Sequence, residues 1–402
     1  MLWTIERMRL VIRTRVDKYT KVKTMPLLEM IEEGILYINP DPAYHHVAAF
    51  FPNIVQLSDQ EFICIYQVGE GMYSTDSNIA LQRSVDGGVT WSEEGFLHDR
   101  SKDDRPWSYH ATFTSRMSDG TLIACPFRAD RSDPAQAFFN DTGGLIAVDQ
   151  LFLVSRDNGK SWTDPVPMDL PEERQATSAQ SIIELADGRW LAVFDLWTTL
   201  DDHRPYQPGM VTFASDDQGK IWKDRVVMAE GAAHGKGFWH GRPLRLSDDR
   251  LFSLLWSADM TEPAKGPIDL PIHYTYADAA GRVWETPKST TIPGQTNSTT
   301  ELPDGRLAAV YTWRETDKPG FMVVISNDGG HTWDLENQIR IWDATGWTHI
   351  GLNRPKLYPR SHDTIAFGVP SIITMMNGDL FASWWCTYAS QVHTRWAIIR
   401  AG

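Results

Sequence analysis

The sequence predicts an all-β protein that forms a six-bladed β-propeller, in which each blade is a four-stranded antiparallel sheet. One observation is a motif of Ser, Asp, Gly and Trp that occurs five times, with its tryptophans 71, 60, 62 and 49 residues apart. A second is a set of six short turns, most of them Asp-Gly or Asn-Gly, each between two apolar runs. A repeat of this length made of strands is typical of a circular array of small sheets.

The five-fold motif has a structural explanation. Its Ser and Asp accept hydrogen bonds from backbone amides in a tight turn, and its Gly adopts positive φ without steric cost. Its Trp then packs a large apolar ring between neighbouring blades. The motif occupies residues 84–91, 155–162, 215–222, 277–284 and 326–333, and the copy at 277–284 is degenerate.

The short turns set the number of blades. They lie at residues 57–60, 117–120, 185–188, 246–249, 302–305 and 376–378. Turns of this kind between apolar runs indicate hairpins. Each blade therefore consists of strand A, the short turn, strands B and C, the motif turn, and strand D.

The last blade has no motif and needs a different fourth strand. We expect a C-terminal strand at 394–399 and an N-terminal strand near 35–38 to complete it and fasten the ring. The chain then divides into an N-terminal extension, residues 1–34, and one propeller domain, residues 35–402.

Composition excludes several classes of function. The formal net charge of −14 argues against a nucleic-acid-binding protein, which needs a basic face. No apolar stretch reaches the ~20 residues of a membrane-spanning helix, and the basic residues 1–24 lack the apolar core of a signal peptide. Cys64, Cys125 and Cys386 fall in B-strand runs, so we expect buried free thiols. The sequence therefore favours a cytoplasmic protein, and no motif indicates a metal or another cofactor.

Strand direction predicts which face carries the functional site. Strands alternate in direction, so the short turns and the motif turns share one face. The opposite face collects the starts of the A strands and the connections from B to C. We expect a ligand to bind there, above the central channel, and the Asp residues of the motifs to be structural.

The motif resembles the Asp-box, or BNR repeat, of the sialidase superfamily, and the chain resembles that superfamily over about residues 36–402. The resemblance implies a glycosidase. Sialidases open their first blade with an Arg-Ile-Pro motif whose Arg binds the substrate carboxylate, and their last blade with a nucleophilic Tyr. Here these places read Phe50-Phe51-Pro52 and Gly368-Val369-Pro370. The chain therefore departs from the sialidase pattern at two functional positions.

Three residues are candidates for acid–base catalysis. Asp76 lies in the stretch where the resemblance implies an acid/base Asp, although an Asp within Ser-Thr-Asp-Ser also suits a turn cap. His110 and His240 begin the A strands of blades 2 and 4, where either could act as a general base. A buried histidine with satisfied hydrogen bonds is the alternative for both.

Further residues near the strand ends on the same face are candidates for substrate binding. Arg314 lies on a blade that resembles the sialidase blade contributing a carboxylate-binding Arg; a surface ion pair is the alternative. Guanidinium groups bind carboxylates or hydroxyls, and aromatic faces stack on sugar rings. The other candidates are Arg128, Arg242, Arg354, Asp195, Trp197, Trp239 and Tyr388.

These residues allow three functions. The first is a sialidase-like exo-glycosidase that removes a terminal sugar, acidic sugars included. The second is a polysaccharide lyase, with a His base and an Arg that neutralises a uronate. The third is a carbohydrate-binding propeller without catalytic activity. In each case the partner is a carbohydrate.

Overall fold

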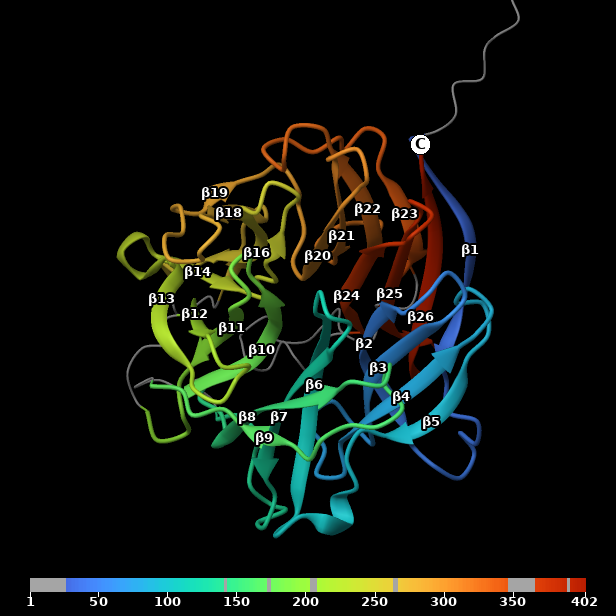
Figure 1. The fold of residues 1–402 in the computed structure, drawn as a ribbon, viewed down its shortest axis with the longest axis vertical. Coiled ribbons are helices and arrows are strands. Elements are labelled where there is room, and N and C mark those ends of the chain that lie inside the picture. Colours follow the sequence, from blue (N-terminus) through green and yellow to red (C-terminus); the bar gives the residue numbers. More distant parts are fainter. Residues whose placement is uncertain are drawn as a thin grey trace, which may run out of the picture.

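The computed structural model describes residues 27–140, 143–171, 175–202, 208–262, 267–345, 366–388 and 391–402. Six antiparallel sheets surround a central axis, and in most of them strand A lies nearest that axis (Figure 1). The predicted fold class is confirmed. The six short turns join strands A and B as expected. Four of them end in a glycine with positive φ: Gly120, Gly188, Gly305 and Gly378.

The first three blades follow the chain without interruption. Blade 1 is β2 (Ala48–Gln56), β3 (Phe62–Gly69), β4 (Asn78–Ser84) and β5 (Ser92–Phe96). Blade 2 is β6 (Trp107–Arg116), β7 (Leu122–Asp130), β8 (Val148–Ser155) and β9 (Val166–Pro167). Blade 3 is β10 (Gln175–Glu184), β11 (Trp190–Trp197), β12 (Gly209–Ser215) and β13 (Lys223–Glu230). Short 3₁₀ turns, η1 (Arg100–Lys102) and η2 (Ala232–His234), precede blades 2 and 4.

Blade 4 is the least regular of the six. Its A strand is split into β14 (Lys236–Trp239) and β15 (Leu244–Arg245), which pair with β16 (Leu251–Asp259). The blade continues with β17 (Ile268–Asp269), β18 (His273–Ala277) and β19 (Lys288–Ser289). Blade 5 is regular again, with β20 (Asn297–Glu301), β21 (Leu307–Trp313), β22 (Gly320–Ser326) and β23 (Ile339–Asp343).

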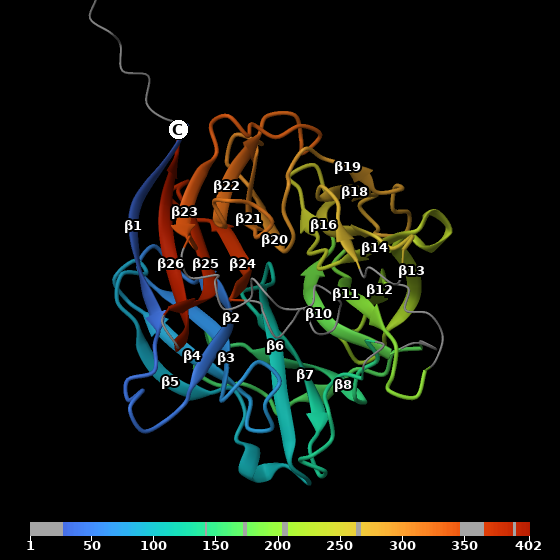
Figure 2. The same ribbon diagram turned by 180° about the vertical axis from the view of Figure 1, so that it is seen from behind.

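The two ends of the described chain meet in blade 6. This blade consists of β24 (Phe367–Thr374), β25 (Leu380–Tyr388), β26 (Gln391–Ala401) and β1 (Leu28–Tyr37). Strand β1 runs antiparallel along the outer edge of β26 (Figure 2). The predicted closure of the ring is confirmed. The strand begins at Leu28, however, so the expected domain boundary at residue 35 falls inside it.

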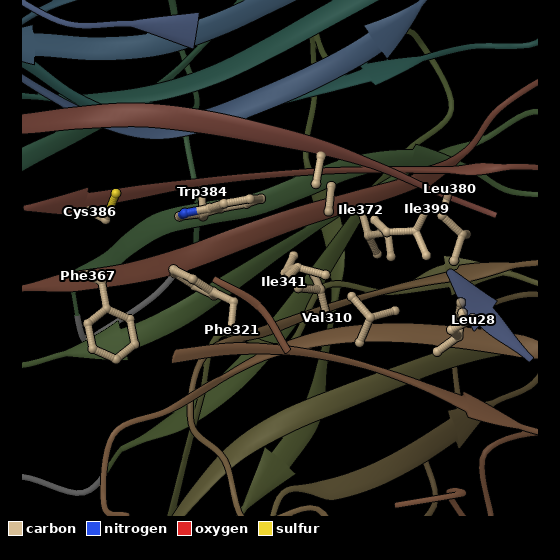
Figure 3. Packing of buried hydrophobic residues seen from close by; sticks show 14 of the residues in the cluster. Leu28, Val310, Phe321, Ile341, Phe367, Ile372, Leu380, Trp384, Cys386 and Ile399 are labelled. Carbon is tan, nitrogen blue, oxygen red and sulfur yellow. The ribbon is translucent and has the colours of Figure 1, made fainter. Parts of the chain in front are cut away.

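Apolar side chains fill the space between neighbouring blades. Figure 3 shows the cluster that joins blades 5 and 6, where the Phe321 ring contacts the rings of Phe367 and Trp384. Leu28 of the N-terminal strand belongs to the same cluster, so closure of the ring buries part of β1. The three cysteines are free and buried on B strands, as expected.

The A strands share an irregularity near the face opposite the Asp-boxes. Register breaks interrupt the pairing of A and B strands at Phe50/Asn53, His110/Phe113 and Gly368/Ser371. Non-glycine residues with positive φ lie at the same height in four blades: Phe51, Ala111, His240 and Val369. Bulges of this kind redirect side chains and are frequent beside functional sites.

Candidate functional site

The face above the channel has an apolar half and a polar half. Blades 6, 1 and 2 contribute the apolar half, a cluster that includes Phe50, Phe51, Phe127, Phe138 and Trp385. Blades 3, 4 and 5 contribute the polar half, in which Asp195, His240, Arg242, Asp269 and Arg314 lie close to one another through the contacts given below. The polar half is the candidate site.

Phe50 illustrates why the apolar half differs from a sialidase site. It stands where the resemblance implied a carboxylate-binding Arg, and its ring packs edge-on against Trp385 with centroids 5.3 Å apart. Both side chains are buried. This position therefore contributes to the core and cannot bind an anion.

His110 belongs to the apolar half. Its side chain is fully buried, stacks on Phe127 and contacts Phe138 edge-on. One ring nitrogen lies 2.7 Å from Ser108 Oγ. Burial lowers the pKa of His110 to about 3, so the imidazole is neutral at physiological pH. These contacts match the structural alternative for His110.

Asp76 lies on the exposed B–C connection of blade 1. Both carboxylate oxygens accept the backbone N–H of Glu70, at 3.1 Å each, and Arg100 donates to the Asp76 carbonyl. Asp76 also lines an open depression of about 490 Å³ formed with Asn78, Phe96 and residues 98–101. These neighbours all belong to blade 1 and to the connection that follows it, so the structure does not bring Asp76 together with the polar half.

Other predicted residues are also separate from the polar half. Arg128 pairs with Asp149 at 2.9 Å and covers the Trp107 ring at 4.0 Å, both within blade 2. Trp197 and Trp239 are buried in one small cluster between blades 3 and 4, but the Trp239 ring also contacts Trp256 at the border of the polar half, with ring centroids 5.2 Å apart. Tyr388 is exposed at the end of β25, and Arg354 lies outside the described residues.

Asp195 and His240 form the first contact of the polar half. The Asp195 side chain is 1% exposed, whereas the His240 side chain is 21% exposed, and their Oδ2 and Nδ1 atoms are 3.6 Å apart. Asp195 also accepts the backbone N–H of His240 at 3.0 Å and a bond from Gln180 at 3.0 Å. Burial raises the pKa of Asp195 to about 8, although these hydrogen bonds and Arg242 oppose the rise.

Trp256 connects His240 with a second carboxylate. The imidazole lies parallel to the indole with ring centroids 5.8 Å apart. The indole Nε1 donates to Asp269 Oδ1 at 2.7 Å, and Gln295 Nε2 donates to Asp269 Oδ2 at 2.7 Å. Asp269 as a residue is exposed, but the surrounding protein limits hydration of its carboxylate and raises its pKa. An imidazole and a carboxylate therefore flank one partly exposed aromatic ring.

Arg314 adjoins this carboxylate from blade 5. Its Nε and Nη2 atoms donate to the Phe367 carbonyl at 3.1 and 2.6 Å, so the guanidinium is fixed against blade 6. Burial lowers the pKa of Arg314 to about 10, and the negative charges of Asp269 and Glu315 oppose that shift. Arg314 is thus charged at neutral pH and lies beside Asp269.

Arg242 crosses the channel. It belongs to blade 4, yet its Nη2 donates to the carbonyls of Asn297 in blade 5 and Pro370 in blade 6, both at 2.6 Å. The guanidinium also lies over the Phe113 ring of blade 2 at 4.7 Å. Burial lowers the pKa of Arg242 to about 9. Arg242 therefore ties four blades together beneath the site.

Sequence reasoning found part of this cluster and missed the rest. Asp195, His240, Arg242 and Arg314 were predicted from their positions at strand ends. Trp256 lies inside the B strand of blade 4, three residues before its end at Asp259, and was not among the predicted residues. Asp269 lies on the two-residue strand β17 and Gln295 lies on the connection between blades 4 and 5, and no periodic pattern marks either residue. Within the described ranges, no group of three His, Cys, Asp or Glu side chains is arranged to hold a metal ion.

Two comparisons concern the sequence itself. Residues 56–238 match the model of the BNR repeat-like domain, which spans blades 1 to 3 and the start of blade 4. No curated protein sequence matches the chain.

Comparison with solved structures gives similar propellers at low sequence identity. A protein of unknown function from Dyadobacter fermentans is 17% identical, with a TM-score of 0.71 over 94% of this chain and 100% of that one. An α-L-arabinanase from Penicillium chrysogenum, complexed with arabinobiose, is 12% identical, with a TM-score of 0.63 over 93% and 98%. The Hadza microbial sialidase Hz136 is 14% identical, with a TM-score of 0.61 over 87% of this chain and 65% of that one.

The similarity to the first two of these structures covers more than nine-tenths of this chain. Among the described residues, no helix is long and apolar enough to span a membrane. The four complete Asp-boxes, the six blades and the BNR repeat-like match over residues 56–238 together support the resemblance of this chain to the sialidase-like superfamily of six-bladed β-propellers.

Proposed function

We propose that this chain is a glycoside hydrolase that removes a terminal sugar at the polar half of its channel face. The observation that carries the proposal is the arrangement around Trp256, where the His240 imidazole stacks on the indole and the Asp269 carboxylate accepts its N–H. A sugar ring needs an apolar surface and nearby acid–base groups for cleavage of its glycosidic bond. The described part of blade 4 supplies both.

Asp269 is the proposed general acid. A carboxyl group with a raised pKa retains its proton closer to neutral pH and can transfer it to the leaving oxygen. His240 is the proposed partner base, because its imidazole is partly exposed and is held against Trp256. Arg314 would orient the sugar hydroxyls or a carboxylate beside Asp269.

A polysaccharide lyase is the second candidate. It is favoured by a partly exposed imidazole, that of His240, and a guanidinium, that of Arg314, which both adjoin the Trp256–Asp269 pair. A lyase abstracts the proton next to a uronate carboxylate, which requires a base and a cation that neutralises the carboxylate. His240 would be the base and Arg314 the cation. The two reactions differ in their products, because hydrolysis adds water whereas elimination leaves an unsaturated sugar.

The test is a screen of aryl glycosides, including α-L-arabinofuranosides and sialosides, together with uronate oligosaccharides. Product masses distinguish the two reactions. We expect a released monosaccharide with the mass of a hydrolysis product. An unsaturated product would favour the lyase, and stoichiometric binding without turnover would favour the carbohydrate-binding alternative.

Asp269→Asn tests the proposed acid. We expect kcat/KM to fall by about 10²-fold or more on the substrate found, the usual effect of losing a general acid. Asp76→Asn is the matched comparison, since it changes the other candidate carboxylate on the same face. A larger loss in Asp76→Asn than in Asp269→Asn would move the acid to blade 1 and refute the assignment made here.

The state of the cysteines bears on the proposed cellular location. Cys64, Cys125 and Cys386 are free thiols, which are common where the environment is reducing. The cytoplasm therefore stays our proposed compartment, with a carbohydrate as the partner.

A further inference from the structure

The joints between blades provide an internal comparison for Asp195. In three joints, a residue with positive φ in one A strand donates its backbone N–H to a side chain of the preceding blade. Ala111 donates to Gln67 Oε1 at 2.9 Å, and Val369 donates to Thr296 Oγ1 at 3.1 Å. His240 donates to Asp195 Oδ1 at 3.0 Å. The three acceptors therefore perform the same structural task.

That task does not require a carboxyl group. Gln67 performs it with a neutral amide that is fully buried, and Thr296 performs it with a neutral hydroxyl. A buried carboxyl group costs more than a buried amide, because water stabilises its ionised form. Of the three joints, the one between blades 3 and 4 has a buried carboxyl group as acceptor. It is also the one whose donor residue is a histidine at the candidate site.

The surroundings of Asp195 couple it to the imidazole. Its Oδ1 accepts the backbone N–H of His240, while its Oδ2 lies 3.6 Å from Nδ1 of the same residue. Asp195 thus accepts a hydrogen bond from the backbone of His240 and also lies within ion-pair distance of its ring. The charged and titratable groups that face it are His240 and, through electrostatic attraction, Arg242; Gln180 adds a neutral donor.

We infer that Asp195 is a positioning residue that orients the His240 imidazole and exchanges a proton with it during the reaction, in addition to closing the joint between blades. This inference rests on the proposed function, in which His240 is the base. When His240 takes a proton at Nε2, the carboxylate of Asp195 stabilises the imidazolium through Nδ1–H. The proton on Nδ1 can move to Asp195 without any change in net charge of the pair.

Asp195→Asn separates the two roles. Asparagine keeps an oxygen that accepts the His240 N–H but cannot carry the negative charge. We expect the melting temperature to stay within about 3 °C of the parent while kcat falls at least 10-fold with little change in KM. We also expect the limb of the pH–kcat profile that belongs to the Asp195–His240 pair to move or disappear.

Asp195→Ala and Gln67→Ala are the matched controls. Each removes the acceptor of one joint, so both should lower the melting temperature by a similar amount. Gln67→Ala should leave the shape of the pH–kcat profile unchanged, since Gln67 serves a joint without an exposed histidine. A changed profile in Gln67→Ala would mean that joint stability alone affects activity, and would overturn the inference.

Nuclear magnetic resonance provides a readout that does not depend on turnover. The imidazole nitrogens of His240, assigned by comparison with the spectrum of His240→Gln, are titrated in the parent and in Asp195→Asn. Loss of the carboxyl group should lower the imidazole pKa by about one unit. An unchanged titration would refute the coupling even if activity fell. A shifted titration in a protein without glycosidase or lyase activity would refute only the proposed function.

Discussion

Two histidines at equivalent places in the fold show how their surroundings decide chemical character. His110 lies within the A strand β6, next to Ala111 with its positive φ, and His240 directly follows the A-strand segment β14 and has positive φ itself. His110 is enclosed by aromatic rings, whereas His240 keeps one face on Trp256 and is partly open to solvent. The sequence could not separate them, because the rings that enclose His110 come from β7, from the B–C connection of blade 2 and from Tyr73 of blade 1, which are distant from His110 along the chain.

The buried His110 should make stability depend on pH. Its pKa is near 6.5 in the unfolded chain and about 3 in the folded protein. Between these two pH values the unfolded chain binds more protons than the folded protein. The free energy of unfolding is therefore not reduced by His110 above pH 6.5, and it decreases as the pH falls from 6.5 towards 3. The slope from this residue is at most ~1.4 kcal/mol per pH unit.

His110→Gln tests this expectation by urea denaturation at several pH values. The variant should be less stable than the parent at pH 7, because Gln fills the aromatic cluster poorly. The difference between the two proteins should narrow as the pH falls from 6.5 to 4.5. A constant difference across this range would mean that His110 is protonated in the folded state.

Asp-boxes are the elements that the sequence predicted most completely. In the box of residues 155–162, the buried Ser155 Oγ accepts the N–H of Gly159 at 2.8 Å and donates to Asp157 at 2.8 Å. Complete boxes at 84–91, 215–222 and 326–333 repeat both bonds. The degenerate copy has Ala277 in place of this Ser, and its Asp278 caps the turn through the N–H groups of Arg282 and Val283. These elements can be predicted from the sequence because their hydrogen bonds join residues only two to four positions apart.

Ser155→Ala should lower the free energy of unfolding by about 1–3 kcal/mol, because it leaves a buried N–H without its acceptor. Ser161→Ala is the control within the same box. The Ser161 hydroxyl also bonds to Asp157 but is exposed, so water replaces it, and the loss should stay below about 1 kcal/mol. Equal losses in chemical denaturation would show that burial of the Ser155 contact is unimportant.

Irregular connections are the elements that the sequence predicted least. The candidate site depends on a hydrogen bond between Asp269, on the short strand β17 of blade 4, and Gln295, on the connection between blades 4 and 5. Strand ends could be located from periodicity, and so Asp195, His240, Arg242 and Arg314 were found. Which side chains contact these residues depends on the paths of the connections between strands. The alternation of apolar and polar residues along the sequence does not predict those paths.

Closure of blade 6 joins the two ends of the described chain through a tight contact. Gly34 of β1 faces Trp396 of β26, and a Cβ atom at this position would lie 2.7 Å from the indole Nε1. Trp396 is buried against Phe381, with stacked rings 5.5 Å apart, so the indole has little room to move. The fit between β1 and β26 therefore depends on a glycine at position 34.

Gly34→Val should loosen this closure and lower the melting temperature of the entire propeller. Overpacking of a tight contact costs about 1–3 kcal/mol. Ile35→Thr, at an exposed neighbouring position of the same strand, is the control and should have little effect. Calorimetry provides the measurement. A separate early transition in Gly34→Val, with the main transition unchanged, would show that blade 6 unfolds independently of the ring.

The pairing of β1 with β26 also has a consequence for synthesis in the cell. The first strand of the ring to leave the ribosome, beginning at Leu28, pairs with the last one, beginning at Gln391. At a translation rate of about 5–20 residues per second, this interval is roughly 20–70 s. During that time β1 has no strand to pair with, although it carries Leu28 and Leu36, which are buried in the folded protein. Nascent chains of this propeller are therefore expected to need protection of one particular segment by chaperones, and that need should end as the final strand emerges.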